Sequence, residues 1–305
     1  MNNFSLFISA ALIWGSTWIM ITFQLGEVEP LVSVIYRFTL ASAVLFIFSY
    51  FRNKQFHFSR FEHFMIFIQG VLLFGFNYWL TYLGITKINS SLAAILSTSI
   101  LYFNVVFARI ILKDKINRNV LVGGAIGFAG ILIIFLPETQ IDNMTSLNNN
   151  IISGVLLVLF ASIFASLGNI VSSKTQRMKL PIIQTNALGM GYAAVLLSVI
   201  ASLSGLNFSF EYSVGYISSL IYLSIFGSVL AFGAFLTLLG RIGPDKAGYI
   251  SLIYPVIALI FSTVFEDYQW SLWGVIGVFI ILFGNAVAMG KLGELKQKLK
   301  AFRVS

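Results

Sequence analysis

Residues 151–172 read IISGVLLVLFASIFASLGNIVS, an uninterrupted apolar stretch without one charged side chain. A helix needs ~20 mainly apolar residues to cross the hydrocarbon core of a bilayer. Transmembrane β-strands instead alternate apolar and polar residues, and this stretch does not alternate. Because a helix satisfies its own backbone hydrogen bonds in lipid, the stretch predicts a transmembrane α-helix.

Nine further segments of the same character occupy most of the chain. They lie at 4–25, 31–51, 64–84, 91–112, 120–136, 181–203, 213–238, 247–265 and 272–290. Charged residues make up only 10% of the chain, against roughly 25% in soluble domains, so lipid must cover much of its surface. The first segment has neither a basic region before it nor a small-residue cleavage site, which argues against a signal peptide. We predict an all-α integral membrane protein with ten transmembrane helices, here called segments one to ten in chain order.

Several functional classes are disfavoured by what the sequence lacks. The chain has no cysteine, which excludes disulfides and thiolate metal sites. Its two histidines, His57 and His63, fall between segments two and three, and no cluster of metal ligands is visible. No stretch matches the phosphate-binding pattern GxxxxGK[ST]. We therefore expect no metal, no cofactor and no ATP-binding subunit, and the scattered positive charges do not indicate a nucleic-acid partner.

The charges between the segments set the expected orientation. With the N-terminus inside, sixteen of the nineteen basic residues fall in cytoplasmic loops or in the tail. They are Arg52, Lys54, Arg60, Lys113, Lys115, Arg118, Lys174, Arg177, Lys179, Arg241, Lys246, Lys291, Lys296, Lys298, Lys300 and Arg303. The outside loops hold Lys87 and most of the acidic residues. The positive-inside rule therefore predicts a multi-pass protein of the cell membrane with both termini in the cytoplasm.

The two halves of the chain share a common order of landmarks. Tyr82-Leu83-Gly84 precedes segment four, as Leu238-Leu239-Gly240 precedes segment nine. Segments five and ten carry glycines with the same spacing, which are Gly123 and Gly130, then Gly277 and Gly284. Small-residue faces of this kind let transmembrane backbones approach closely. The pattern indicates two copies of one five-helix unit.

Five helices per unit insert the second copy upside down. The loop at residues 113–118 is basic, whereas its counterpart at residues 266–270 is acidic, as opposite sides of a membrane require. We predict a first repeat at 1–136, an extracytoplasmic linker at 137–150, a second repeat at 151–290 and a basic cytoplasmic tail at 291–305. Inverted repeats are common in secondary transporters, whose substrates bind near the midplane between the halves.

Trp14-Gly15-Ser16 and Tyr36-Arg37-Phe38, together with the glycine-spaced segments five and ten, resemble the EamA-type transporters of the drug/metabolite transporter superfamily. The resemblance covers nearly the whole chain as two EamA units. It implies export of amino acids or related metabolites by alternating access, with two halves that rock against each other. Members typically carry Pro and Glu around segments four and nine. Here Pro255 and Glu266 fit segment nine, whereas segment four lacks the proline and departs from exact symmetry.

Arg37 is the most informative single residue, because it lies about seven residues into segment two, or ~10 Å deep. An intramembrane charge is costly and needs a partner, a water-filled cavity or a route to the interface. We expect the side chain to snorkel outwards towards Glu27 and Glu29. The alternative is that it binds a carboxylate or phosphate of the substrate. Arg109, near the inner end of segment four, is expected to be a snorkelling anchor.

Polar and aromatic side chains inside the apolar segments form the candidate substrate cavity. Amides in hydrocarbon must find hydrogen bonds, so they should face the bundle interior. The candidates are Trp14, Ser16, Arg37, Asn77, Tyr78, Ser97, Tyr102, Asn169, Asn186, Tyr249 and Tyr254. Each amide could equally join helices, and each aromatic ring could equally be packing. We expect the cavity between the halves, lined by segments one to four and six to nine, with five and ten at the periphery.

These features favour a secondary transporter or facilitator of a small metabolite, not an enzyme. The absence of carboxylates deep inside the segments argues against an Asp/Glu proton relay. The alternative is a membrane-embedded enzyme acting on lipid-linked substrates, which would need clustered Asp, Glu or His near the interface. A receptor or scaffold is disfavoured because the loops are too short to dock much. Uptake of radiolabelled metabolites into vesicles discriminates between these classes.

Overall fold

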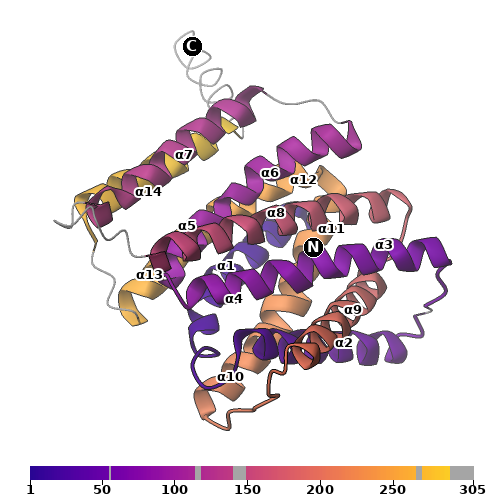
Figure 1. Ribbon diagram of the computed structural model, residues 1–305. Helices are drawn as coiled ribbons and strands as arrows, with labels where there is room; N and C mark the ends of the chain where they lie inside the picture. The colour runs from indigo at the N-terminus through magenta and orange to yellow at the C-terminus, as the bar shows by residue number, and fades with distance from the viewer. Residues whose placement is uncertain (55, 114–117, 140–148, 266–269, 289–305) are drawn as a thin grey trace.

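The computed structural model describes the chain except residues 55, 114–117, 140–148, 266–269 and 289–305. The described residues form helices joined by short loops, and no strand occurs among them (Figure 1). By length and composition, eight of the described helical segments could cross a membrane, and a ninth, shorter apolar helix is present. The predicted tail at 291–305 and most of the predicted linker at 137–150 lie outside the described residues.

The helices of the first half follow the predicted segments to within a few residues. They are α1 (Asn3–Thr22), α2 (Pro30–Phe51), α3 (Arg60–Gly70), η1 (Val71–Phe76), α4 (Asn77–Ile85), α5 (Ser90–Leu96), η2 (Ser97–Ser99), α6 (Ile100–Phe107), η3 (Ala108–Leu112) and α7 (Arg118–Thr139). Segment three is thus α3–η1–α4 in one continuous run, and segment four is α5–η2–α6–η3.

The second half is built in the same way. Its helices are α8 (Asn149–Arg177), α9 (Ile182–Leu203), α10 (Val214–Tyr222), η4 (Leu223–Leu230), α11 (Ala231–Ile242), α12 (Pro244–Ala247), η5 (Gly248–Leu252), α13 (Tyr254–Phe265) and α14 (Leu272–Ala288). Segment eight is α10–η4–α11, and segment nine is α12–η5–α13. Gly243, with φ +87°, turns the chain sharply between them, a conformation that glycine adopts without steric cost.

Local sequence explains where several helices begin. Pro30 starts α2, where its missing N–H is no loss because the first turn has no acceptor for it. Ser59 and Glu62 form a reciprocal capping box at the start of α3. The Asn89 side chain accepts a hydrogen bond from the Leu92 N–H at 2.8 Å and so caps α5.

Four turns that depart from the α-helix occur at matching places in the two halves, whereas η3 of segment four, also π-helical, has no counterpart among the described residues of segment nine. Segments three and eight each contain a π-helical stretch, η1 and η4. Segments four and nine each contain a 3-10 stretch, η2 and η5. The sequence did not predict these turns. Since π-helical turns often mark functional sites, their positions direct attention to the middle of the bundle.

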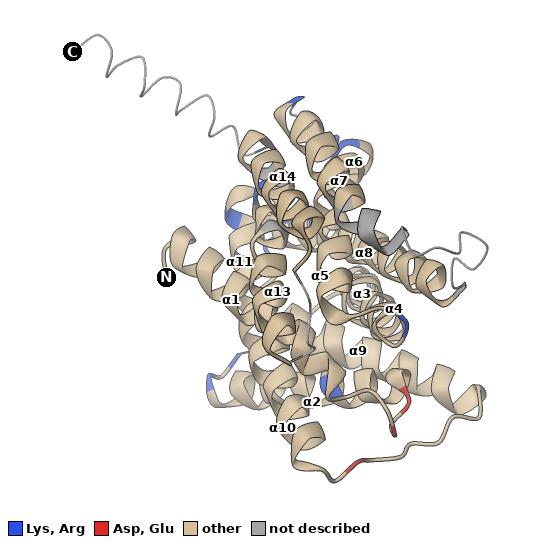
Figure 2. Cartoon of the chain, turned by 90° about the vertical axis from the view of Figure 1, so that its left-hand side faces the viewer, with Lys and Arg blue, Asp and Glu red and all other residues tan. Residues whose placement is uncertain are grey.

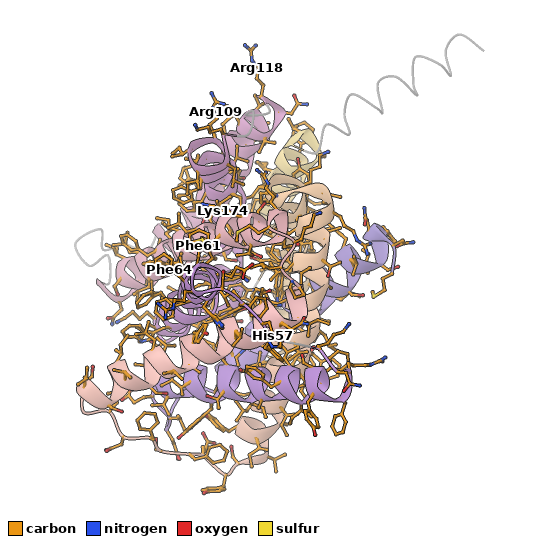
Figure 3. The ribbon with its side chains drawn as sticks, turned by 90° about the vertical axis from the view of Figure 1, so that its right-hand side faces the viewer. His57, Phe61, Phe64, Arg109, Arg118 and Lys174 are labelled. Atoms are coloured by element: carbon orange, nitrogen blue, oxygen red, sulfur yellow. The ribbon has the colours of Figure 1, made fainter. Side chains whose placement is uncertain are left out.

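Contacts between helices place segment two beside segment seven, and they place segments one and six each between two segments of the other half. In detail, α2 packs against α9, α1 packs against α11 and α13, and α8 packs against segments three and four. In Figure 2 the Asp and Glu residues, in red, lie mainly at the lower right, whereas most of the Lys and Arg residues, in blue, lie to the left and at the top. Arg109 is exposed and projects from the top of the molecule in Figure 3, as expected of an interfacial anchor.

Helices α7 and α14 pair with each other at one edge of the molecule, where Figure 1 shows them side by side. A Cβ atom built on Gly284 would lie 2.6 Å from the carbonyl oxygen of Gly123, and one on Gly130 would lie 2.8 Å from that of Gly277. Side chains therefore cannot occupy these positions without separating the backbones. The prediction that these glycines form close-packed faces is confirmed, and segments five and ten lie at the periphery.

We expect Gly284→Ala to destabilise the α7–α14 pair, because its methyl group would meet the backbone of α7. Overpacking of this kind costs about 1–3 kcal/mol. Thermal unfolding in detergent should therefore begin several degrees lower. The matched control is Gly233→Ala, since a Cβ atom there meets nothing within 4 Å. Equal unfolding temperatures for the two variants would contradict the packing argument.

Candidate functional site

A cavity lies near the middle of the bundle, between segments one, three and four on one side and segments six, eight and nine on the other. Its lining includes Trp14, Thr17, Trp18, Asn77, Tyr78, Thr81, Ser97, Asn104, Ser162, Asn169, Phe232, Phe235, Ser251 and Tyr254. Its volume is about 90 Å³, counted as the space open to the centres of water molecules. One water molecule needs roughly 10–15 Å³ by this measure. The cavity therefore has room for several waters or for part of a small polar ligand.

Aromatic rings form one wall of the cavity. The ring centroid of Trp14 lies 5.0 Å from that of Phe232 and 4.9 Å from that of Phe235. Trp18 stacks on Tyr254 at 5.8 Å. These spacings are those of favourable aromatic pairs, so the rings hold one another in place. The wall offers a rigid apolar surface to a ligand.

Hydrogen bonds fix the polar part of the lining. The Ser97 and Tyr254 hydroxyls are 2.6 Å apart, and either oxygen can be the donor. The Asn169 amide donates from Nδ2 to Asn104 Oδ1 at 3.4 Å, and Asn104 donates from Nδ2 to the Pro244 carbonyl at 3.5 Å. Asn169 Oδ1 is buried and has no hydrogen-bond partner. A buried acceptor without a partner is costly, so this oxygen is available to a ligand donor.

The indole of Trp14 connects the aromatic wall to the π-helical turn of segment eight. Its Nε1–H donates to the carbonyl oxygen of Gly227 in η4 at 3.1 Å. A Cβ atom on Gly227 would lie 2.9 Å from Cγ2 of Thr17, so only glycine permits this close approach of η4 to α1. The irregular turn therefore determines where one side of the cavity lies.

Arg37 is buried next to the cavity, with no exposed surface. Its Nε donates to Ser228 Oγ at 3.0 Å, and its Nη1 donates to the Tyr82 hydroxyl at 3.4 Å. Its Cζ lies 4.4 Å from the ring centroid of Tyr78, a cation–π distance. The expected snorkelling towards Glu27 and Glu29 is therefore wrong. Because α2 packs against segment three and η4, the side chain enters the bundle, where hydroxyl groups and a ring replace water.

Comparison with known proteins decides the family. The EamA-like transporter family model matches residues 3–136 and 152–290. The chain belongs to the EamA-like transporter family. It is 27% identical over 279 residues to the uncharacterized transporter YoaV of Bacillus subtilis, covering 91% of this chain and 93% of that protein. It is 26% identical over 286 residues to the uncharacterized inner membrane transporter YedA of Escherichia coli, covering 92% and 88%.

A solved crystal structure supports the fold of this EamA-like chain. The two superpose with a TM-score of 0.71 over 95% of this chain and 97% of the other, at 16% sequence identity. Identity at that level supports the fold alone. The family and the apolar helices together make the chain a membrane-embedded transporter, consistent with a small-molecule substrate.

Six of the predicted site residues of this EamA-like transporter line the cavity, namely Trp14, Asn77, Tyr78, Ser97, Asn169 and Tyr254. The other five do not. Ser16 is bonded to the Tyr222 hydroxyl at 2.6 Å, and Tyr102 packs against Gly124 and Gly127 of α7. Tyr249 packs with Leu101, and Asn186 is buried in α9.

Among the described residues that line this cavity none comes from α2 or α9, so it lacks the contribution expected from segments two and seven. These helices pack on each other, so their inner faces are used for mutual contact. Arg37, from α2, reaches only the far side of Tyr78. The lining residues that were not candidates include Trp18, Thr81 and Ser162.

A helical repeat in the sequence could have found some of these residues. Trp14 and Trp18 are four residues apart in α1, as are Asn77 and Thr81 in α4. Residues four apart lie on one face of an α-helix. Extending each candidate by one helical turn would therefore have recovered them. No comparable signal identifies Phe232 or Phe235, which are two among many phenylalanines.

We expect Trp14→Phe to lower stability by about 1 kcal/mol, because it keeps an aromatic ring but removes the donor to Gly227. Trp18→Phe is the matched control, since Trp18 is a neighbouring tryptophan of the same wall that makes a stacking contact. Thermal unfolding of the purified protein measures both variants. A larger loss for Trp18→Phe would show that ring size, not the indole hydrogen bond, sustains the wall.

Proposed function

We propose that this protein is a secondary transporter that moves a small metabolite, an amino acid or a related compound, out of the cell through the central cavity. The observation that carries the proposal is the symmetry of the lining. Segments one, three and four contribute to it, and so do segments six, eight and nine, which are their counterparts in the second EamA unit. In inverted-repeat transporters the substrate binds at such an interface between the repeats.

An inverted pair of five-helix units is part of the same proposal. The packing partners support it, because segment one contacts eight and nine just as segment six contacts three and four. Segments two and seven contact each other, and so do five and ten. The paired π-helical turns and the paired 3-10 turns support it as well. Alternating access then follows from rocking of one unit against the other around a fixed site.

The lining also bears on how transport is driven. The described residues around the cavity include no Asp, Glu or His. A proton relay through buried carboxylates therefore has no group to use at this site. Facilitated diffusion, or coupling through other groups, fits the lining better. A membrane-embedded enzyme for lipid-linked substrates is the competing proposal. Such an enzyme would need Asp, Glu or His as acid and base, and the described lining of this cavity does not provide them.

We further propose that the protein lies in the cell membrane with both termini in the cytoplasm, as the charge distribution favours. Reporter fusions made after residues 140 and 300 test this arrangement. A reporter fused after residue 140 should lie on the outer side of the membrane, and one fused after residue 300 should lie in the cytoplasm. If both reporters lie on one side of the membrane, the inverted arrangement of the two units is refuted.

Filling the cavity should abolish transport without unfolding the protein. Ala165 lines the cavity on α8 and is buried, so Ala165→Phe adds a phenyl ring to the space that a substrate needs. We expect uptake of radiolabelled metabolites into proteoliposomes to fall at least tenfold. Ala129→Phe is the control, because Ala129 is exposed on the outer side of α7. Equal transport by the two variants would remove the central cavity from the pathway.

A further inference from the structure

Among the residues that the structure describes, no carboxylate pairs with the buried positive charge of Arg37. Its hydrogen-bond partners are the hydroxyl groups of Ser228 and Tyr82. Tyr82 donates in turn to Gln24 Oε1 at 2.8 Å, so the chain of hydrogen bonds ends in an amide and not in a carboxylate. Nη2 of the guanidinium has no hydrogen-bond partner. A guanidinium in this state has both an uncompensated charge and a free donor.

One side chain separates this charge from the cavity. Tyr78 covers the guanidinium with its ring and also lines the cavity. A Cβ atom on Gly227 would lie 3.1 Å from Arg37 Nη2 and 2.9 Å from Thr17 Cγ2, and Thr17 is a cavity residue as well. The unpartnered nitrogen therefore lies beside the cavity wall. The Tyr78 ring therefore lies between the guanidinium and the cavity.

We propose that the transported metabolite carries one carboxylate and that Arg37 is its counter-charge, an inference that rests on the proposed transport function. The planar guanidinium matches the two oxygens of a carboxylate, and charge-assisted bonds of this kind are roughly twice as strong as those to a neutral hydroxyl. The wall formed by Trp14, Phe232 and Phe235 holds the apolar part of the same molecule. Asn169 Oδ1 accepts a hydrogen bond from its polar donor.

The charge balance narrows the substrate class. A single guanidinium neutralises a single carboxylate. A phosphate monoester carries about −1.5 to −2 at neutral pH and would leave excess negative charge in a site of low dielectric. A cationic amine would face an unscreened like charge, which the lining does not offset with a carboxylate. The charge of Arg37 thus favours a ligand with one carboxylate over phosphate esters and over cations that lack a carboxylate. A zwitterionic amino acid meets the guanidinium through its carboxylate, and its ammonium group then needs acceptors such as Asn169 Oδ1.

The test uses the full-length protein in proteoliposomes and a panel of radiolabelled amino acids and small monocarboxylates. Each acid is paired with its amide, which lacks the carboxylate charge, and with the corresponding amine. We expect wild-type protein to transport one or more acids at least tenfold faster than the paired amide and amine. Arg37→Met removes the charge but keeps a side chain of similar length, so it should remove this preference. Arg37→Lys keeps the charge but loses the planar fork, so it should retain part of the preference.

The outcomes separate charge recognition from a purely structural role. If Arg37 is only structural, its substitution lowers transport of acid and amide alike, in proportion to the amount of folded protein. Retention of the acid preference in Arg37→Met therefore overturns the inference. Wild-type transport of amides or amines as fast as acids also overturns it, even if the variant fails to fold. In that case loss of the same transport in Ala165→Phe leaves the proposed function standing. Arg109→Lys, at an exposed arginine, is the control and should behave like wild type.

Discussion

Lipid offers no hydrogen bonds, so every polar group of this protein inside the bilayer needs a partner that the protein supplies. Many serine and threonine hydroxyls find theirs within their own helix. Ser16 and Thr17 each donate at 2.8 Å to the carbonyl oxygen three residues earlier in α1. Indole and amide groups must reach other helices, as Trp14 reaches Gly227 and Asn169 reaches Asn104. The cavity therefore exists inside a frame of hydrogen bonds between segments, and an unpartnered atom of a lining residue, such as Asn169 Oδ1, is a place where a ligand gains a hydrogen bond.

The helices were the predictable part of the fold, because length and hydrophobicity follow directly from the thickness of a bilayer. Segment two was predicted at 31–51 and forms α2 at Pro30–Phe51. The glycine faces of α7 and α14 were also predictable, since close backbone packing leaves few other residue types. The π-helical and 3-10 turns had no signal, because their residues are as apolar as those of ordinary α-helices and only tertiary packing selects them.

Cavity membership was predictable only in part, because the sequence gives the polarity of a residue but not the direction in which the packed helix presents it. Tyr102 has the same chemistry as Tyr254, yet its ring packs against Gly124 and Gly127, and Tyr254 stacks on Trp18. Arg37 shows the same limit. Its depth in segment two follows from the sequence, but the choice between snorkelling and burial depends on α2 packing against η4, which brings Ser228 within 3.0 Å.

The position of Arg37 also relates substrate binding to movement of the two EamA units. Arg37 belongs to the first unit, and its partner Ser228 belongs to the second. A carboxylate that reached the guanidinium would offer a stronger, charge-assisted bond than the neutral hydroxyl does. Under the proposed function, a carboxylate that binds through Nε and a terminal nitrogen would displace Ser228 and so exchange a contact between the units for a contact with the substrate. A ligand shifts a conformational equilibrium only through its different affinity for the two states. In that binding mode, the empty and loaded transporter would favour different arrangements of the units at this one interface.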